Sequence, residues 1–200
     1  QPVPLYTRAG ALSALGRWRE ALAACEAALA FWPAHAELLN HHGALLRALD
    51  RPSEALASLQ RALQADPLHV AAWVNHAHAL ADLGLHEPST QSYRRAFELA
   101  PDLPLLAGQY LHARLKICDW DGLDELLARV AQGIEAGHPV CEPFVALLTP
   151  LGRASLRKCA ESHVRRQWGP ACAKAEPLGR APSPASAQRR LRIGYFSADF

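Results

Sequence analysis

Proline recurs at a fixed spacing of 34 residues in the first half of the chain, at Pro33, Pro67 and Pro101. Because the chain holds 15 prolines, the spacing is informative only if other positions keep the same register. They do when each unit is numbered so that its proline is position 32. Small residues then fill position 8 (Ala9, Gly43, Ala77), position 20 (Ala21, Ala55, Ser89) and position 27 (Ala28, Ala62, Ala96), and bulky residues fill position 4 (Leu5, Leu39, Trp73). Small side chains in fixed columns predict pairs of closely packed antiparallel helices.

A repeating two-helix unit of this length is similar to the tetratricopeptide repeat (TPR). The resemblance covers residues 2–103, in units of about 2–35, 36–69 and 70–103. A unit of this size cannot bury its own apolar face, so we expect an all-α superhelix with a convex and a concave surface. Unrelated amphipathic helices with an accidental period are the alternative, and the four matching columns argue against it. The predicted helix pairs are 4–15 with 18–31, 37–49 with 52–65, and 71–83 with 87–99.

The fourth unit, 104–135, keeps the length but loses the small residues of the first three. Leu111, Leu123 and Val130 replace them, and Glu135 stands at the proline position. Such a unit caps an array or leads into another structure. We therefore predict TPR-like repeats over 1–135, followed by three segments. These are transitional helices over 136–170, including one near 153–168, a linker or loop rich in Ala, Pro and Ser over 171–189, and the start of a second domain over 190–200.

Composition disfavours several classes of function. The formal charge of +2 and the scattered arginine pairs argue against a nucleic-acid partner. No long apolar run or signal segment is visible, so we expect a cytoplasmic protein without membrane contact. Five cysteines without a CxxC pair disfavour disulfides and a zinc site. Histidines that are adjacent (His41, His42) or two apart (His76, His78) do not share a helix face, so we expect neither a metal nor a cofactor.

The last ten residues differ in character from the rest. A β-prone run at 191–196 follows two arginines and precedes Ser197 and Asp199. A strand followed by a polar loop is typical of the opening of a nucleotide-binding α/β unit. We predict one strand at 191–196, and we expect the polypeptide to continue into a second domain beyond Phe200.

The TPR-like units are followed by an Ile-Cys-Asp-Trp block (Ile117–Trp120), by Pro150-Leu151 and by RLRIGYFSADF at Arg190–Phe200. The order of these features resembles the protein O-GlcNAc transferases, and the Ala/Arg/Leu-rich composition suggests a bacterial homologue. The resemblance implies a GT-B glycosyltransferase that moves N-acetylglucosamine from the donor UDP-GlcNAc to Ser or Thr of proteins, with inversion and without a metal. It places the catalytic residues beyond Phe200, so we assign none in this chain. The matching catalytic-domain motif includes Arg192, Gly194, Tyr195, Ser197, Asp199 and Phe200.

The same resemblance implies an acceptor-peptide groove on the concave face. In the family, asparagines at position 6 of successive first helices hold the acceptor backbone, and here that position holds Thr7, His41, Asn75 and Gln109. Only Asn75 keeps the family residue, although polar uncharged side chains still suit backbone amides. A merely solvated face is the alternative. Position 9 holds Gly10, Ala44, His78 and His112, so the groove lacks an acidic ladder.

Two rival functions remain open at this stage. A non-catalytic TPR adaptor that clamps a carboxylate needs Lys or Arg on its first helices. The segments 37–49 and 71–83 hold only Arg47, which weakens that reading. A related TPR transferase could instead use GDP-fucose, or glucosylate asparagine, and this part of the sequence does not discriminate between donors. It also leaves the oligomeric state open.

Overall fold

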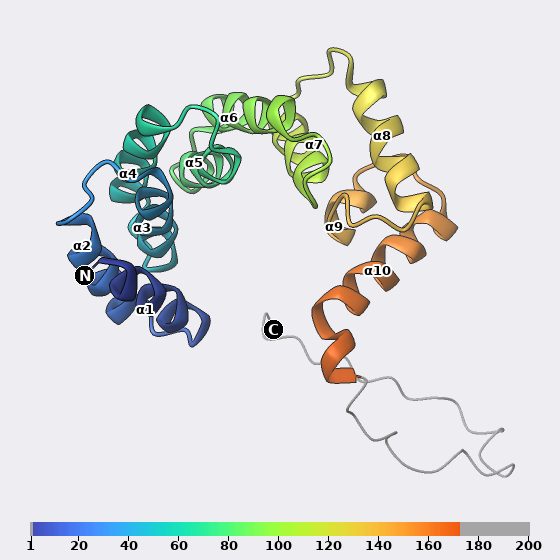
Figure 1. The fold of residues 1–200 in the computed structure, drawn as a ribbon. Helices are drawn as coiled ribbons and strands as arrows, with labels where there is room; N and C mark the ends of the chain where they lie inside the picture. Colours follow the sequence, from blue (N-terminus) through green and yellow to red (C-terminus); the bar gives the residue numbers. More distant parts are fainter. Residues whose placement is uncertain (1, 173–200) are drawn as a thin grey trace, which may run out of the picture. The chain divides into compact units, whose positions relative to one another are not determined.

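The computed structural model describes residues 2–172, which form ten α-helices and no strand (Figure 1). The predicted strand at 191–196, the motif residues near it and most of the predicted linker lie outside the described residues. The chain divides into two compact units, Gln1–Val164 and Arg165–Phe200, and every site discussed below lies in the first. The helices of the array are α1 (Pro2–Ala14), α2 (Trp18–Leu29), α3 (Ala36–Ala48), α4 (Pro52–Ala65), α5 (Val70–Asp82) and α6 (His86–Leu99).

The first six helices are three antiparallel pairs of the kind that the proline spacing predicts. Each predicted helix is present, with ends within two residues of the expected ones. The helices pack within each pair, α1 on α2, α3 on α4 and α5 on α6, and α2 and α4 pack on the first helix of the following pair. The two first helices α3 and α5 also touch directly. An all-helical array is therefore confirmed for these residues.

The columns of small residues lie where the helices approach each other most closely. Gly43 shows this best, because a Cβ added there would lie 2.6 Å from Cγ of Leu59 on the partner helix α4. That distance is shorter than carbon atoms tolerate without a shift of one side chain. The alanines of positions 8, 20 and 27 are all fully buried: Ala9, Ala21, Ala28, Ala55, Ala62, Ala77 and Ala96.

The fourth helix pair, α7 (Leu106–Lys116) and α8 (Leu123–Glu135), packs differently from the others. Its larger residues Leu111 and Val130 are fully buried, and they belong to a core that includes Ala146 of α9 (Pro143–Leu147) and Cys159 of α10 (Arg153–Cys172). The bulky residues of this unit therefore fill a core shared with the helices that follow. In the first three units, small residues at these positions allow two helices to approach closely instead.

The segment before α9 returns to the beginning of α7. The carbonyl oxygen of Pro139 accepts a hydrogen bond from the amide of Leu105 (2.7 Å), and that of Val140 accepts one from Gly108 (2.9 Å). The first amides of a helix have no partner inside it, so these carbonyls cap α7. A Cβ at Gly108 would lie 2.6 Å from Cα of Cys141, so only glycine permits this approach.

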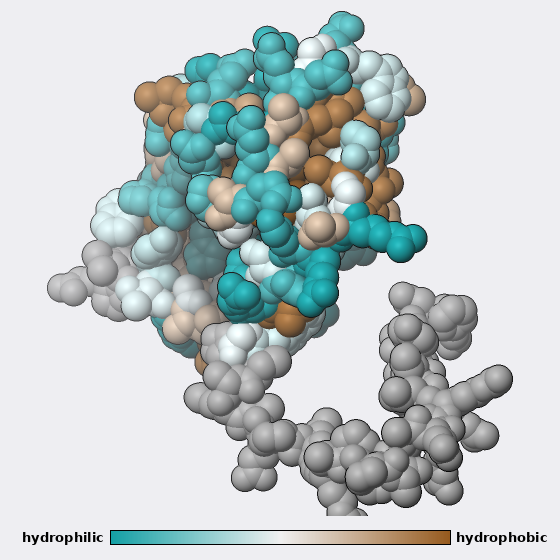
Figure 2. All heavy atoms as spheres, turned by 90° about the vertical axis from the view of Figure 1, so that its right-hand side faces the viewer, coloured by the Kyte–Doolittle hydropathy of each residue, from teal (hydrophilic) through white to brown (hydrophobic). Residues whose placement is uncertain are grey.

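The last two helices differ from the prediction in one detail. α10 extends to Cys172, so residues 171–172, which we assigned to the linker, are helical. The short helix α9 buries Val145 and Ala146 but leaves Phe144 and Leu147 about two-thirds exposed. Figure 2 shows hydrophobic residues at the surface among hydrophilic ones on the face turned toward the viewer. None of the described helices is both long and apolar enough to cross a membrane.

Candidate functional site

The four predicted groove residues lie on the first helices of successive pairs. Thr7 of α1 is exposed, whereas His41 of α3, Asn75 of α5 and Gln109 of α7 are half-buried. His41 and Asn75 each form a hydrogen bond to the preceding first helix. Nε2 of His41 lies 3.0 Å from Oγ of Ser13, and Nδ2 of Asn75 donates to Oδ1 of Asn40 over 2.8 Å. His41 and Asn75 therefore lie where successive first helices meet. A role of the four position-6 residues in binding stays a prediction.

Asn75 combines a structural contact with unused hydrogen-bonding capacity. Its amide joins α5 to the buried Asn40 of α3 through one N–H. An amide side chain has a second N–H and a carbonyl oxygen. The bond to Asn40 holds the amide plane in one orientation, which prepares the remaining groups for a polar partner.

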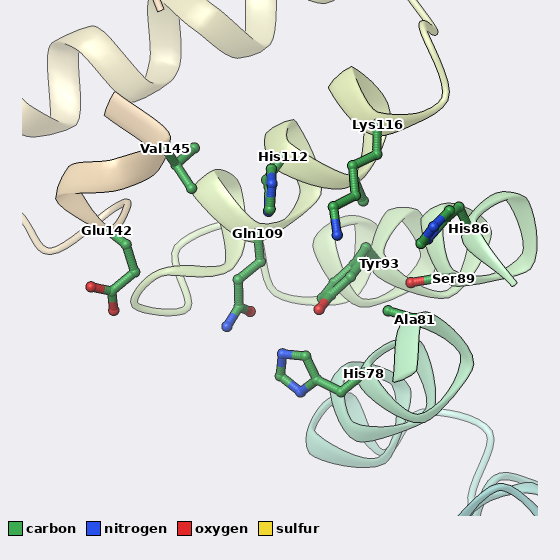
Figure 3. A pocket seen from close by; sticks show the side chains of 11 residues that line it. His78, Ala81, His86, Ser89, Tyr93, Gln109, His112, Lys116, Glu142 and Val145 are labelled. Atoms are coloured by element: carbon green, nitrogen blue, oxygen red, sulfur yellow. The ribbon is translucent and has the colours of Figure 1, made fainter. Parts of the chain in front are cut away.

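Gln109 lies next to two histidines of the position-9 column. Together with His78 of α5 and His112 on its own helix, it lines a pocket of about 220 Å³ where α5, α6, α7 and α9 meet (Figure 3). Lys116 of α7 and Glu142, just before α9, also line this pocket, and the groove prediction omitted both. Glu142 comes from outside the repeats, so the repeat pattern gave no signal for it.

Two of the histidines that our sequence analysis considered only as metal ligands, His42 and His76, form contacts within the repeats. Nδ1 of His42 lies 2.8 Å from Oγ of Ser58, and Nδ1 of His76 lies 3.0 Å from Oγ of Ser92, so the same contact joins both helices of two successive pairs. Burial is the main cause that lowers the pKa of both histidines, so both rings are neutral near pH 7.

A second pair of equivalent histidines begins two first helices. Nδ1 of His35 accepts a hydrogen bond from the amide of Leu38, and Nδ1 of His69 accepts one from Ala72, each over 3.3 Å. These are N-caps of α3 and α5. His35 and His69 are one repeat apart, as are His42 and His76, so the repeat spacing itself is the signal that could have revealed both pairs.

The Cys-Asp-Trp block forms the turn between α7 and α8. Cys118 adopts a left-handed backbone conformation with φ of +54°. Asp119 accepts two hydrogen bonds from Arg114, at 2.9 and 3.1 Å, and Arg114 also donates to the carbonyl of Asp121. The side chain of Arg114 is only 7% exposed, so this ion pair orders the turn, which gives the aspartate of the block a structural role.

Comparison with known proteins agrees with this architecture. Residues 70–103 match the tetratricopeptide repeat family, over the same residues as the third predicted unit. No curated protein matches the chain. Among solved structures, MamA from Desulfovibrio magneticus RS-1 (residues 41 to the end) is similar with a TM-score of 0.59 and 22% identity, over 64% of this chain and 73% of that one.

Two structures of another protein are similar over most of their own length. The first TPR of Spaghetti (RPAP3), bound to the HSP90 peptide SRMEEVD, has a TM-score of 0.57 and 15% identity, over 59% of this chain and 94% of that one. The NMR structure of the first TPR domain of human RPAP3 has a TM-score of 0.56 and 15% identity, over 60% and 95%. At these identities the likeness shows the fold alone. Helix pairs of the TPR type are thereby shown, and they suggest a scaffold for protein–protein interaction.

Proposed function

We propose that the first helices of the array bind an extended polypeptide segment through their position-6 side chains. One observation carries this proposal. Asn75 uses one side-chain N–H to bond to Asn40, which leaves its second N–H and its carbonyl oxygen for a ligand. The other position-6 residues are also polar and uncharged. An extended backbone offers one N–H and one C=O per residue, and amide side chains match both. A TPR structure with a bound peptide gives the fold a precedent for such a ligand.

We further propose that the bound segment is the acceptor of a glycosyltransferase. The polypeptide would move N-acetylglucosamine from UDP-GlcNAc to a Ser or Thr hydroxyl, with inversion and without a metal, in the cytoplasm. The support is the resemblance of Ile117–Trp120 and Arg190–Phe200 to the O-GlcNAc transferases. The chemistry would lie in a GT-B domain that follows the array. A related transferase with another donor, such as GDP-fucose, and a scaffold without catalysis are the alternatives.

Substitution of Asn75 tests the binding proposal. Asn75→Ala removes the hydrogen bond to Asn40 and the free amide groups, whereas Asn40→Ala removes only the former. We expect Asn75→Ala to weaken binding of an extended peptide by roughly 0.5–1.5 kcal/mol more than Asn40→Ala does. Fluorescence anisotropy with labelled peptides from a random-sequence library measures this difference. Equal losses in the two variants would assign Asn75 a purely structural role.

A transfer assay on the polypeptide extended beyond Phe200 tests the enzymatic proposal. We expect transfer from radiolabelled UDP-GlcNAc to Ser/Thr peptides, and weaker acceptor binding without a change in donor hydrolysis when Asn75 is replaced by Ala. The 200-residue chain alone should give a flat calorimetric titration with UDP, because a sugar-nucleotide pocket needs the ends of several strands and a second lobe. If the polypeptide that continues beyond Phe200 binds peptides but neither binds UDP nor transfers sugar, a scaffold without catalysis remains as the function.

A further inference from the structure

Two buried cysteines near the end of the described chain lie in contact with each other. Sγ of Cys141, in the segment before α9, lies 3.8 Å from Sγ of Cys159 in α10. Both belong to the core that the fourth helix pair shares with α9 and α10. The lack of a CxxC pair disfavoured disulfides in the sequence, but these two cysteines, 18 residues apart, are brought together by the fold.

The two thiols are not equivalent. The S–H of Cys159 lies within reach of the carbonyl oxygen of Cys141, with 3.5 Å between sulfur and oxygen. Burial is the largest cause that raises the pKa of Cys141 to about 12, and the neighbouring Cys159 adds to it. Burial also raises the pKa of Cys159, but the hydrogen bond with Cys141 opposes that rise. Cys159 is therefore the thiol that ionises first.

The segment that carries Cys141 is the one that caps α7. The carbonyl oxygen of Val140 accepts a hydrogen bond from the amide of Gly108, and a Cβ at Gly108 would lie 2.6 Å from Cα of Cys141. Because Cys141 lies outside any helix, its segment can adjust as the sulfurs approach to the distance of about 2.05 Å that a disulfide needs. A bond to Cys159 would join α10 to the backbone that holds the beginning of α7.

We infer that Cys141 and Cys159 form an oxidation site, at which hydrogen peroxide converts the two thiols into a reversible disulfide that fastens α10 to the segment capping α7. This site is independent of the proposed function. Access favours a small oxidant, because the two residues are only 4% and 5% exposed. Oxidation is slower than at the exposed Cys118, since the thiolate is the reactive form.

The reaction has two steps. The thiolate of Cys159 attacks one oxygen of the peroxide, the O–O bond breaks, and a sulfenic acid and a hydroxide ion form. The hydroxide takes the proton of Cys141, whose thiolate then attacks the sulfur of Cys159. The S–S bond forms, the S–O bond breaks, and a second hydroxide leaves and takes the proton that Cys159 released. The two thiols lose two electrons and two protons, and the peroxide becomes two water molecules.

Peptide mapping of the whole chain tests the disulfide. The folded chain is treated with hydrogen peroxide at pH 8, catalase removes the peroxide, and iodoacetamide in denaturant blocks the remaining thiols before digestion with trypsin. We expect the tryptic peptides 130–153 and 159–165 to be joined, and to separate when a phosphine reductant is added. Cys159→Ala should abolish the joined peptides. Cys25→Ala removes a buried cysteine elsewhere and should leave them unchanged.

Hydrogen exchange tests whether the bond fastens the segment. A disulfide restricts states in which the two ends of its loop separate, and this loop spans 18 residues. We expect the amide of Gly108 to exchange about tenfold more slowly, or slower still, in the oxidised chain than in the reduced chain. Amides of α3, which is remote from the two cysteines in the sequence, should exchange equally in both.

The outcomes separate the parts of this inference. Joined peptides that form only in denaturant, or a pair that stays reduced while Cys118 is oxidised to the sulfinic acid, would overturn the oxidation site. Joined peptides with unchanged exchange at Gly108 would overturn the fastening of the segment. Polypeptide binding by the array is measured separately, so its failure leaves the oxidation site standing, and the reverse also holds.

Discussion

Gly43 sets the distance between α3 and α4, and its replacement tests whether the repeat register is right. A Cβ there would meet Leu59, whereas a Cβ at Gly10, also within a helix, would meet nothing within 4 Å. We expect Gly43→Ala to destabilise the fold by about 1–2 kcal/mol, because overpacking exceeds the gain in helix propensity. Gly10→Ala should instead stabilise it by about 0.5–1 kcal/mol. Urea denaturation measures both, and a stabilised Gly43→Ala variant would contradict the close contact.

Burial of cysteines predicts a strong difference in thiol reactivity. Burial raises the pKa of Cys25 and Cys141 from 9.0 to about 12 and also raises that of Cys159, whereas Cys118 is exposed. A shift from 9 to 12 reduces the thiolate fraction at pH 8 about a thousandfold.

Mass spectrometry after iodoacetamide treatment at pH 8 measures this difference. In a Cys172→Ser background, we expect Cys118 to react first and the three buried cysteines only after denaturant is added. Rapid modification of Cys141 in the folded chain would show that the segment before α9 opens readily.

The beginning of α7 depends on backbone contacts with residues that follow it by more than thirty positions. Its first amides donate to Pro139 and Val140, and Gly108 touches the backbone of Cys141. We expect Gly108→Ala to cost about 2–4 kcal/mol, because the added methyl group meets backbone atoms that cannot rotate away. Gly152→Ala, where a Cβ meets nothing within 4 Å, is the matched control and should change stability little.

Hydrogen exchange gives a local readout of the same change. In Gly108→Ala we expect faster exchange at the amides of α7 and slower or unchanged exchange in α3 and α4. Uniform loss of protection over the whole chain would show that α7 and the first repeats unfold together.

The helices of the repeats could be predicted from sequence, and the surroundings of α7 could not. A proline or a small residue acts within its own unit, so the spacing of Pro33, Pro67 and Pro101, together with the columns of small residues, was enough to place α1 to α6. The cap on α7 joins residues far apart in sequence, and no pattern predicted it. The candidate site divides in the same way. The repeat register places Asn75 and Gln109 at equivalent positions of first helices, and their role in binding, which the family resemblance implies, stays a prediction. Glu142 lines the pocket because of how the chain returns to α7, which no repeat position indicates.

At the scale of the whole molecule, the equivalence of the repeats predicts which deletions the chain tolerates. Removal of residues 36–69 joins His35 directly to Val70, so His35 takes the place of His69 as the N-cap of α5. We expect a shorter chain that remains helical by circular dichroism and unfolds cooperatively, with lower stability because neighbouring repeats support each other.

Removal of residues 36–52, half of one repeat, is the control. It joins helices out of register, and we expect a loss of cooperative unfolding. Equal behaviour of the two deletions would show that the repeat period does not govern the packing of the array.

The cap on α7 also affects the order in which a growing chain can fold on the ribosome. α1 to α6 contact mainly their neighbours, so each pair can form soon after its own residues are synthesised. The amide of Gly108 instead waits for Val140, about thirty residues later, which at ~5–20 residues per second is a delay of roughly 2–6 s. During that interval the first three pairs can form a folded surface on which α7 completes its packing once Pro139 and Val140 have been added.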